Sequence, residues 1–105
     1  MMPAGDPVLR RFRAALDRLY GERLERVVLF GSRARGDARP DSEYDIAVFL
    51  REFGDRWRAI DRIIPIVTGI TDDTGAVIHA TPYRAGSYAR RTSLMREIRR
   101  DGIDL

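Results

Sequence analysis

Apolar residues recur along the chain at two spacings, one typical of helices and the other typical of strands. Asp6 and Pro7 form a helix-start signal, because Asp caps free amides and Pro needs no hydrogen bond at the first helical position. Apolar residues then recur every three or four positions until Gly21, a stop signal. This pattern predicts a helix over residues 7–20 with an apolar side made of Val8, Phe12, Leu16 and Leu19.

Two further segments show helical spacing. We expect a helix over residues 55–64, ended or kinked by Pro65 and Gly69, with a buried stripe of Trp57, Ile60 and Ile64. A last helix is expected over residues 92–100, with Gly102 as its left-handed cap. Its inward-facing residues are predicted to be Leu94, Met95 and Ile98.

Shorter apolar runs predict strands over residues 27–30, 43–51 and 76–81. Residues 72–75 are expected to form a turn into the third strand, and residues 82–88 a loop after it. With a short helix after the first strand, the order is αβαβαβα. That order predicts an α/β (α+β) fold in which helices flank a sheet of three or more strands.

Composition narrows the classes of protein. The 105 residues fit one small domain over residues 1–105, and 44% hydrophobic with 33% charged residues excludes a disordered polymer. Apolar runs are too short to span a membrane, so we expect a soluble, cytoplasmic protein without a membrane partner. The absence of Cys excludes disulfides and thiol nucleophiles. All 19 basic residues are Arg, which suits phosphate or carboxylate recognition, or reflects a GC-rich coding sequence.

The stretch that carries candidate chemistry follows the first strand. Gly31 lets a phosphate approach the backbone. The free N–H groups at the start of the helix expected at Ser32, together with the Ser32 hydroxyl, can bind the phosphate oxygens. After ten intervening residues come Glu43 and Asp45, whose alternation along a strand places both carboxylates on one face, with Cβ atoms about 6–7 Å apart. Carboxylates this close repel unless a cation such as Mg²⁺ lies between them. Alone, the Gly-Ser turn is more typical of an ordinary turn, and the carboxylate pair of a solvated strand face. Together, at this spacing, they favour nucleotidyl transfer.

The sequence from Leu29 to Val48 resembles the signature of the DNA polymerase β-like nucleotidyltransferases, in which Gly-Ser is followed after ten residues by Asp-x-Asp. The short chain and the form Gly-Ser-Arg-Ala-Arg-Gly resemble the minimal nucleotidyltransferase (MNT) subfamily, and residues 92–105 are similar to its bacterial members. The resemblance implies a nucleotidyltransferase fold with a mixed sheet, binding ATP as substrate and Mg²⁺ as cofactor. It also implies the antitoxin of a HEPN/MNT toxin–antitoxin pair, which transfers AMP to a tyrosine hydroxyl of a HEPN-type toxin in a hetero-oligomer.

On this resemblance, Gly31 and Ser32 hold the nucleotide phosphates, while Glu43 and Asp45 are the metal ligands and catalytic residues. The first acid is Glu rather than the usual Asp, and its extra methylene moves the carboxylate by about 1.5 Å. The family's third carboxylate is also missing from the third strand. His79 has the right parity to take that position as a proton acceptor, or it is a surface or partner-facing residue.

The remaining charges have two interpretations each. Arg33 and Arg35 lie within a turn of the expected phosphate site, where they suit nucleotide binding or are simply solvated. The segment from Arg84 to Arg100 carries six Arg and one Glu, a charge of +5 that fits an acidic partner or nucleic acid. We favour a solvated helix face there, and expect no direct nucleic-acid binding.

Two alternatives stand beside an adenylyltransferase antitoxin. Glu43 and the missing third acid also suit a catalytically weak or inactive nucleotidyltransferase-fold antitoxin that neutralises its toxin by direct binding. A small-molecule nucleotidyltransferase resembling the aminoglycoside-modifying enzymes is less favoured, because the chain lacks the added domain with which those enzymes bind the drug.

Overall fold

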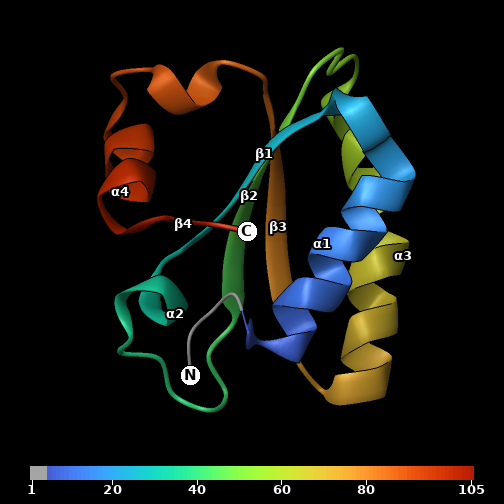
Figure 1. Ribbon diagram of the computed structural model, residues 1–105, viewed down its shortest axis with the longest axis vertical. Helices are drawn as coiled ribbons and strands as arrows, with labels where there is room; N and C mark the ends of the chain where they lie inside the picture. Colours follow the sequence, from blue (N-terminus) through green and yellow to red (C-terminus); the bar gives the residue numbers. More distant parts are fainter. Residues whose placement is uncertain (1–4) are drawn as a thin grey trace.

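The computed structural model describes residues 5–105 (Figure 1). In chain order, its elements are α1 (Pro7–Tyr20), η2 (Gly21–Arg23), β1 (Leu24–Phe30), α2 (Ser32–Arg35), β2 (Tyr44–Leu50), α3 (Arg56–Thr74), β3 (Ile78–Arg84), η3 (Ser87–Ala89), α4 (Ser93–Asp101) and β4 (Ile103–Asp104). All seven predicted elements are present. The two 3-10 helices, η2 and η3, and the short strand β4 were not predicted. Every helix in the described part of the chain is too short or too polar to span a bilayer.

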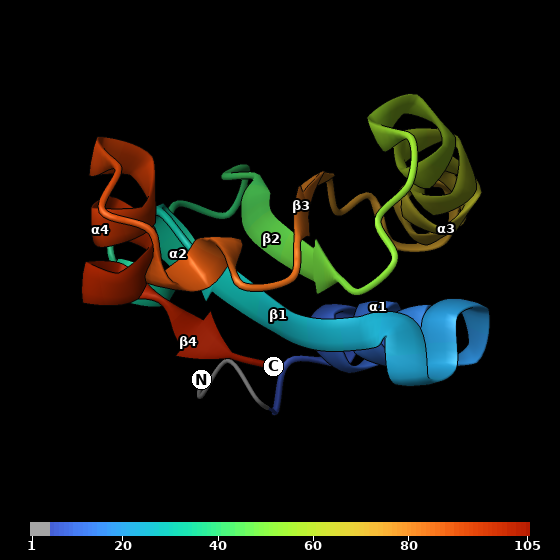
Figure 2. The ribbon, with the colours of Figure 1, turned by 90° about the horizontal axis from the view of Figure 1, so that it is seen from above.

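The four strands form one mixed sheet in the order β3-β2-β1-β4. β1 pairs antiparallel with β2 and with β4, whereas β2 and β3 run parallel. Figure 2 shows α1 and α3 on one face of this sheet and α4 on the other. The predicted fold class, a mixed sheet with flanking helices, is therefore confirmed.

Strand β2 divides its side chains between two cores. Alternate residues enter the larger core under α1 and α3, which includes Tyr44, Ile46, Val48 and Leu50. The intervening residues Ala47 and Phe49 enter a smaller core with Met95 and Ile98 of α4. The predicted period-two order of this strand is confirmed, so Glu43 and Asp45 share the face of Ala47 and Phe49.

The prediction for α3 was wrong in length and in orientation. The helix does not end at Pro65 but continues to Thr74, because apolar contacts on both sides of Pro65 outweigh the lost hydrogen bond, a cost of about 3 kcal/mol. It turns a different face to the sheet from the one expected. The residues that it buries are Ala59, Ile63 and Ile70, whereas Trp57 is 72% and Ile64 51% exposed. The expected buried stripe is thus a surface stripe.

The longer α3 also displaces the turn expected over residues 72–75. Asp72 and Asp73 lie in the last helical turn, and the helix ends at Gly75, whose φ of 78° is left-handed and whose N–H donates to the carbonyl of Thr71. Gly meets this requirement without strain because it has no Cβ.

The loop expected over residues 82–88 was also wrong, because β3 continues through Pro82 to Arg84. β3 is an edge strand, and the N–H of Tyr44 in β2 donates to the carbonyl of Val77 at 2.9 Å. Backbone groups alternate in direction along a strand, so odd-numbered residues of β3 face β2 and even-numbered ones face outward. Pro82 therefore points its nitrogen away from the sheet, where the missing N–H costs no ladder bond.

The C-terminal helix α4 buries Met95 and Ile98 as predicted, but Leu94 is 41% exposed. Gly102 is not the predicted left-handed cap: its φ and ψ of −67° and 144° are extended and lead directly into β4. A Cβ on Gly102 would collide with the carbonyl of Ile98, so the close packing of this turn explains the glycine.

Candidate functional site

The Gly-Ser turn lies where β1 ends and α2 begins. Gly31 has φ 73° and ψ −157°, and a Cβ at this position would collide with the carboxylate of Asp45. Both the backbone conformation and the close approach of Asp45 therefore require glycine. Register places the two neighbours together, since Phe30 pairs with Asp45 across β1 and β2.

The start of α2 presents backbone donors beside this turn. The N–H groups of Ala34 and Arg35 both donate to the carbonyl of Gly31, at 3.1 Å each. The N–H groups of Ser32 and Arg33 come before the first intrahelical bond and have no acceptor within the helix. Two amides and the half-buried Ser32 side chain thus come directly after Gly31, the residue that the Asp45 carboxylate approaches.

Glu43, Asp45 and His79 form a cluster at the beginning of the parallel pair β2 and β3. Glu43 precedes β2 and is exposed, Asp45 is half-buried, and His79 is in register with Asp45. The imidazole Nδ1 of His79 lies 3.7 Å from Oδ1 of Asp45. One ligand atom from each of the three residues lies within 4.8 Å of the other two.

This cluster has the donors that a divalent cation requires. Mg²⁺ takes oxygen ligands and is usually held by one or two carboxylates together with phosphate oxygens and water. Glu43 and Asp45 supply two carboxylates on one strand face, and the missing side chain of Gly31 lets the Asp45 carboxylate lie against the Gly-Ser turn. The residues present therefore fit a Mg²⁺ ion, with the two carboxylates as its protein ligands.

Arg33 makes contacts that sequence reasoning missed. Its guanidinium donates to the carbonyl of Ser42 from Nε at 3.0 Å and from Nη2 at 2.7 Å, and lies 4.0 Å above the ring of Tyr44. These bonds attach the loop before β2 to helix α2. The loop carries Glu43, so the structure places Arg33 where it fixes the approach of that carboxylate to the cluster.

Arg35 lies on the exposed side of α2. Its guanidinium pairs with Asp37 at 3.3 Å and with Asp101 of α4 at 3.6 Å. A hydrogen bond from Arg100, and then the nearby charges, hold the pKa of Asp101 below its usual range. No local pattern indicates this link, because Asp101 lies far along the chain.

Tyr44 connects the site to the first helix. Its buried hydroxyl donates to Oδ2 of Asp6 at 2.8 Å, while Oδ1 of Asp6 accepts the N–H of Val8 at 2.8 Å and caps α1. Burial, followed by the bond to Asp6, raises the pKa of Tyr44. The helix cap was predictable from the sequence, but its second partner was not.

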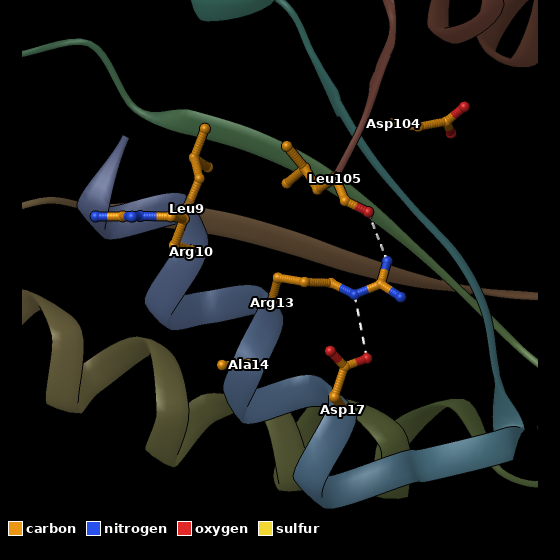
Figure 3. A pocket seen from close by; sticks show the side chains of 7 residues that line it. All are labelled: Leu9, Arg10, Arg13, Ala14, Asp17, Asp104 and Leu105. Atoms are coloured by element: carbon orange, nitrogen blue, oxygen red, sulfur yellow. Dashed lines mark hydrogen bonds and ion pairs between the residues drawn. The ribbon is translucent and has the colours of Figure 1, made fainter. Parts of the chain in front are cut away.

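Two hollows lie along β3 and near the start of β2. One, of about 360 Å³, runs between α3 and β3 and includes His79 in its wall. The other, of about 350 Å³, lies beside Arg33, Ser42 and Tyr44. A separate pocket of about 240 Å³ lies between α1 and the last residues of the chain, where Arg13 donates to Asp17 and to the carbonyl of Leu105 (Figure 3). None of the predicted site residues lines that pocket.

A match to a family model shows the family of this chain. Residues 9–78, two thirds of the chain, match the model of the nucleotidyltransferase domain. The chain therefore belongs to the nucleotidyltransferase domain family, and the predicted membership is confirmed.

Individual relatives agree with this assignment. The curated "Putative protein adenylyltransferase" of Methanocaldococcus jannaschii is 33% identical over 45 residues, which are 43% of this chain and 46% of that protein. The match thus spans about half the length of the curated relative. The crystal structure of "a putative nucleotidyltransferase from Sulfolobus solfataricus" has a TM-score of 0.61 at 17% identity, over 99% of this chain and 86% of that one. A toxin–antitoxin crystallised with AMP-PNP has a TM-score of 0.56 at 19% identity, over 89% and 68%. These two structures share the fold.

Proposed function

We propose that this protein, a single domain, is the adenylyltransferase antitoxin of a toxin–antitoxin pair. It transfers AMP from ATP to a hydroxyl, that of a tyrosine, on a HEPN-type toxin. Membership of the nucleotidyltransferase domain family supports the reaction class, and a curated relative named as a protein adenylyltransferase supports a protein acceptor. The likeness of the fold to a toxin–antitoxin crystallised with AMP-PNP supports the nucleotide and the partner.

The cluster of Glu43, Asp45 and His79 carries this proposal. Glu43 and Asp45 hold Mg²⁺, which neutralises phosphate charge when bound. Ser32 and the first amides of α2 hold the phosphate oxygens. The acceptor oxygen attacks the α-phosphorus in line, the bond to the pyrophosphate oxygen breaks, and pyrophosphate leaves.

His79 takes the proton that the acceptor hydroxyl loses. The imidazole is exposed, so a docked hydroxyl can reach it, and its Nδ1 lies 3.7 Å from Oδ1 of Asp45. His79 thereby occupies the position that a third carboxylate has in the family that the sequence resembles.

Transfer of labelled AMP tests the proposal. The protein is mixed with ATP labelled on the α-phosphate, Mg²⁺ and the protein encoded by the neighbouring gene, and label on that partner is measured. We expect label with Mg²⁺ and none with a chelator. Asp45→Asn, which keeps the shape beside Gly31, should lower the rate about 100-fold or more. Asp41→Asn is the matched control, since Asp41 is an exposed acid of the loop before β2 and lies outside the cluster.

A second function has one observation in its favour. The third member of the cluster is a histidine rather than a carboxylate, and Glu43 is exposed at the surface. These features suit an antitoxin with weak or lost catalysis that acts by direct binding. Co-expression with the toxin separates the two: if Asp45→Asn still neutralises as wild type does and no AMP is transferred, the binding function is correct and the catalytic one is wrong.

A further inference from the structure

A groove leads from the cluster along the open edge of the sheet. It has a volume of about 360 Å³ and lies between α3 and β3. His79 stands at one end of the groove, where it also belongs to the Glu43–Asp45 cluster, and Arg56 stands at the other. The groove therefore shares one residue, His79, with the cluster.

The wall on the side of α3 is apolar and continues onto an exposed surface. Ile60, Ile63, Ile64 and Val67 line the groove. Trp57 precedes Ile60 and Ile64 on the same helix face, at spacings of three and four residues. Only four large apolar side chains among residues 5–105 are exposed, and Trp57 and Ile64 are the two most exposed of them. A folded domain gains nothing in its own stability from apolar groups that stay in water, so this stripe indicates a partner surface.

The opposite wall is the backbone of β3. No other strand of the described chain pairs with its outer side, as Figures 1 and 2 show. The outward groups are those of the even-numbered residues, so Ile78 and Ala80 each offer an N–H and a carbonyl. Pro82 offers a carbonyl alone. Backbone pairing is therefore most complete beside His79 and ends at Pro82, a span of about 13 Å.

We propose that this groove binds an extended, mainly apolar segment of the acceptor protein, which adds to the sheet as a strand along β3. The inference rests on the proposed function, because it states where the acceptor docks. The segment's backbone pairs with Ile78 and Ala80, its apolar side chains cover Ile64 and Trp57, and its acceptor hydroxyl lies at His79. A strand that pairs with a sheet edge gains affinity from the backbone and specificity from its side chains.

Charge gives the segment a second feature. Arg56 and His79 are the two ionisable residues in the wall of the groove, and Arg56 makes no ion pair among the described residues. An acidic side chain on the segment, about four residues from the hydroxyl, would meet Arg56 while the hydroxyl lies at the cluster. The occupant is thus an apolar strand with a hydroxyl at one end and an acid at the other.

Binding of the protein encoded by the neighbouring gene tests this surface by titration calorimetry. Ile64→Glu should weaken binding about tenfold or more, because it places a charge against an apolar segment. Leu94→Glu is the matched control: Leu94 is an exposed helical residue as well, but it lies on α4, across the sheet. It should bind as wild type does. Both side chains are exposed, and thermal melts confirm that each variant folds.

Amide hydrogen exchange supplies the test of strand pairing. With the partner bound, the N–H groups of Ile78 and Ala80 should exchange at least about tenfold more slowly, while those at the start of α4 keep their rates. The chain has one Trp, so fluorotryptophan incorporated at Trp57 gives one fluorine NMR signal, which should shift with the partner and not with ATP alone.

The results separate the docking surface from the proposed reaction. If the partner binds, protects these amides and requires Ile64, but receives no AMP, the reaction is wrong and the docking surface stands. If AMP is transferred while Ile64→Glu behaves as wild type and no amide of β3 is protected, the docking surface is wrong. The docking surface is also wrong if the partner does not bind, or if the protein alone forms dimers that protect Ile78 and Ala80.

Discussion

The two faces of strand β2 differ in how completely the helices bury them. On one face, Tyr44, Ile46, Val48 and Leu50 are buried along the whole strand beneath α1 and α3. On the other face, Ala47 and Phe49 are buried under α4 and η3, but Glu43 is exposed and Asp45 half-buried. Helices therefore bury the first face along the whole strand, whereas they bury the second face only from Ala47 onward.

This difference shows where the fold leaves room for chemistry. α4 is a short helix of nine residues and the smaller core has five buried members, so the start of the face is left open to solvent. The parallel neighbour β3 then adds His79 to the same opening. Residues of the fully covered face should therefore govern stability, and residues of the open end should govern activity.

The largest expected effect on stability comes from the covered face. Ile46→Ala removes a fully buried side chain from the larger core and should lower the free energy of unfolding by about 2–5 kcal/mol. Denaturant titration measures this loss. Asp45→Asn, one residue earlier, should change the same free energy by less than about 1 kcal/mol, because Asp45 is half-buried and its replacement has the same shape. Equal losses of unfolding free energy in the two variants would contradict the claim that the covered face, and not the open end, governs stability.

Gly31→Ala should lower both the stability of the fold and the affinity for nucleotide. The new Cβ would meet the Asp45 carboxylate and would be held at a positive φ, which together cost about 1–3 kcal/mol. Nucleotide binding should fall with it, because Asp45 must move. Gly36→Ala is the matched control: Gly36 also has a positive φ, of 84°, but has open space around its Cβ position. A Gly36 variant that loses nucleotide binding equally would contradict the specific role of Gly31.

Arg33→Met should loosen the open end without unfolding the protein. The variant keeps an unbranched side chain over Tyr44 but loses the bonds to the carbonyl of Ser42, a cost of about 1–2 kcal/mol. Because those bonds fix the loop that carries Glu43, divalent-metal affinity should fall by more than this stability loss explains. Calorimetric titration with Mn²⁺ measures it. Arg39→Met, in the same loop, should leave the affinity unchanged, since Arg39 makes no side-chain hydrogen bond among the described residues.

The smallest effect concerns pH. The hydrogen bond from Arg100 and the charge of Arg35 lower the folded-state pKa of Asp101, so its contribution to stability is present above the unfolded pKa, about 3.9. It is lost as the pH falls through the folded value. Asp101→Asn should therefore be less stable than wild type at pH 7, and the difference should vanish in acid below the folded pKa. Thermal melts across this range check the sign; a constant difference would contradict the ionic origin.

The sequence predicts the fold and the cluster where the signals are local. The cap at Asp6 and Pro7 and the period-two order of β2 need only near neighbours, so the bounds of α1 and both faces of β2 were predicted correctly. On α1 itself, Phe12 and Leu16 are buried as expected, but Leu9 and Tyr20 are buried in place of Val8 and Leu19. Glu43 and Asp45 could be found for the same reason. His79 was found by parity alone, and its position beside Asp45 depends on the parallel register of β2 and β3, which no single segment encodes.

The errors arose where packing between distant segments overrides a local signal. Pro65 is a strong helix breaker, yet α3 continues because Ile63 and Ile70 pack against the sheet on either side. Trp57 has helical spacing with other apolar residues, but the rotation of α3 is set by its contacts with the sheet, and so Trp57 lies at the surface. The contacts of Arg33 were hidden because a guanidinium reaches a carbonyl nine residues away as readily as a phosphate.

The proposed function requires a divalent cation between Glu43 and Asp45 at the open end of β2. Calorimetric titration of Mn²⁺ into wild type, Asp45→Asn and Asp41→Asn, each with a non-hydrolysable ATP analogue, tests it directly and needs no partner. We predict that wild type and Asp41→Asn bind the metal with equal affinity and that Asp45→Asn binds it about 100-fold more weakly or not at all. Equal affinity in all three proteins would contradict the claim.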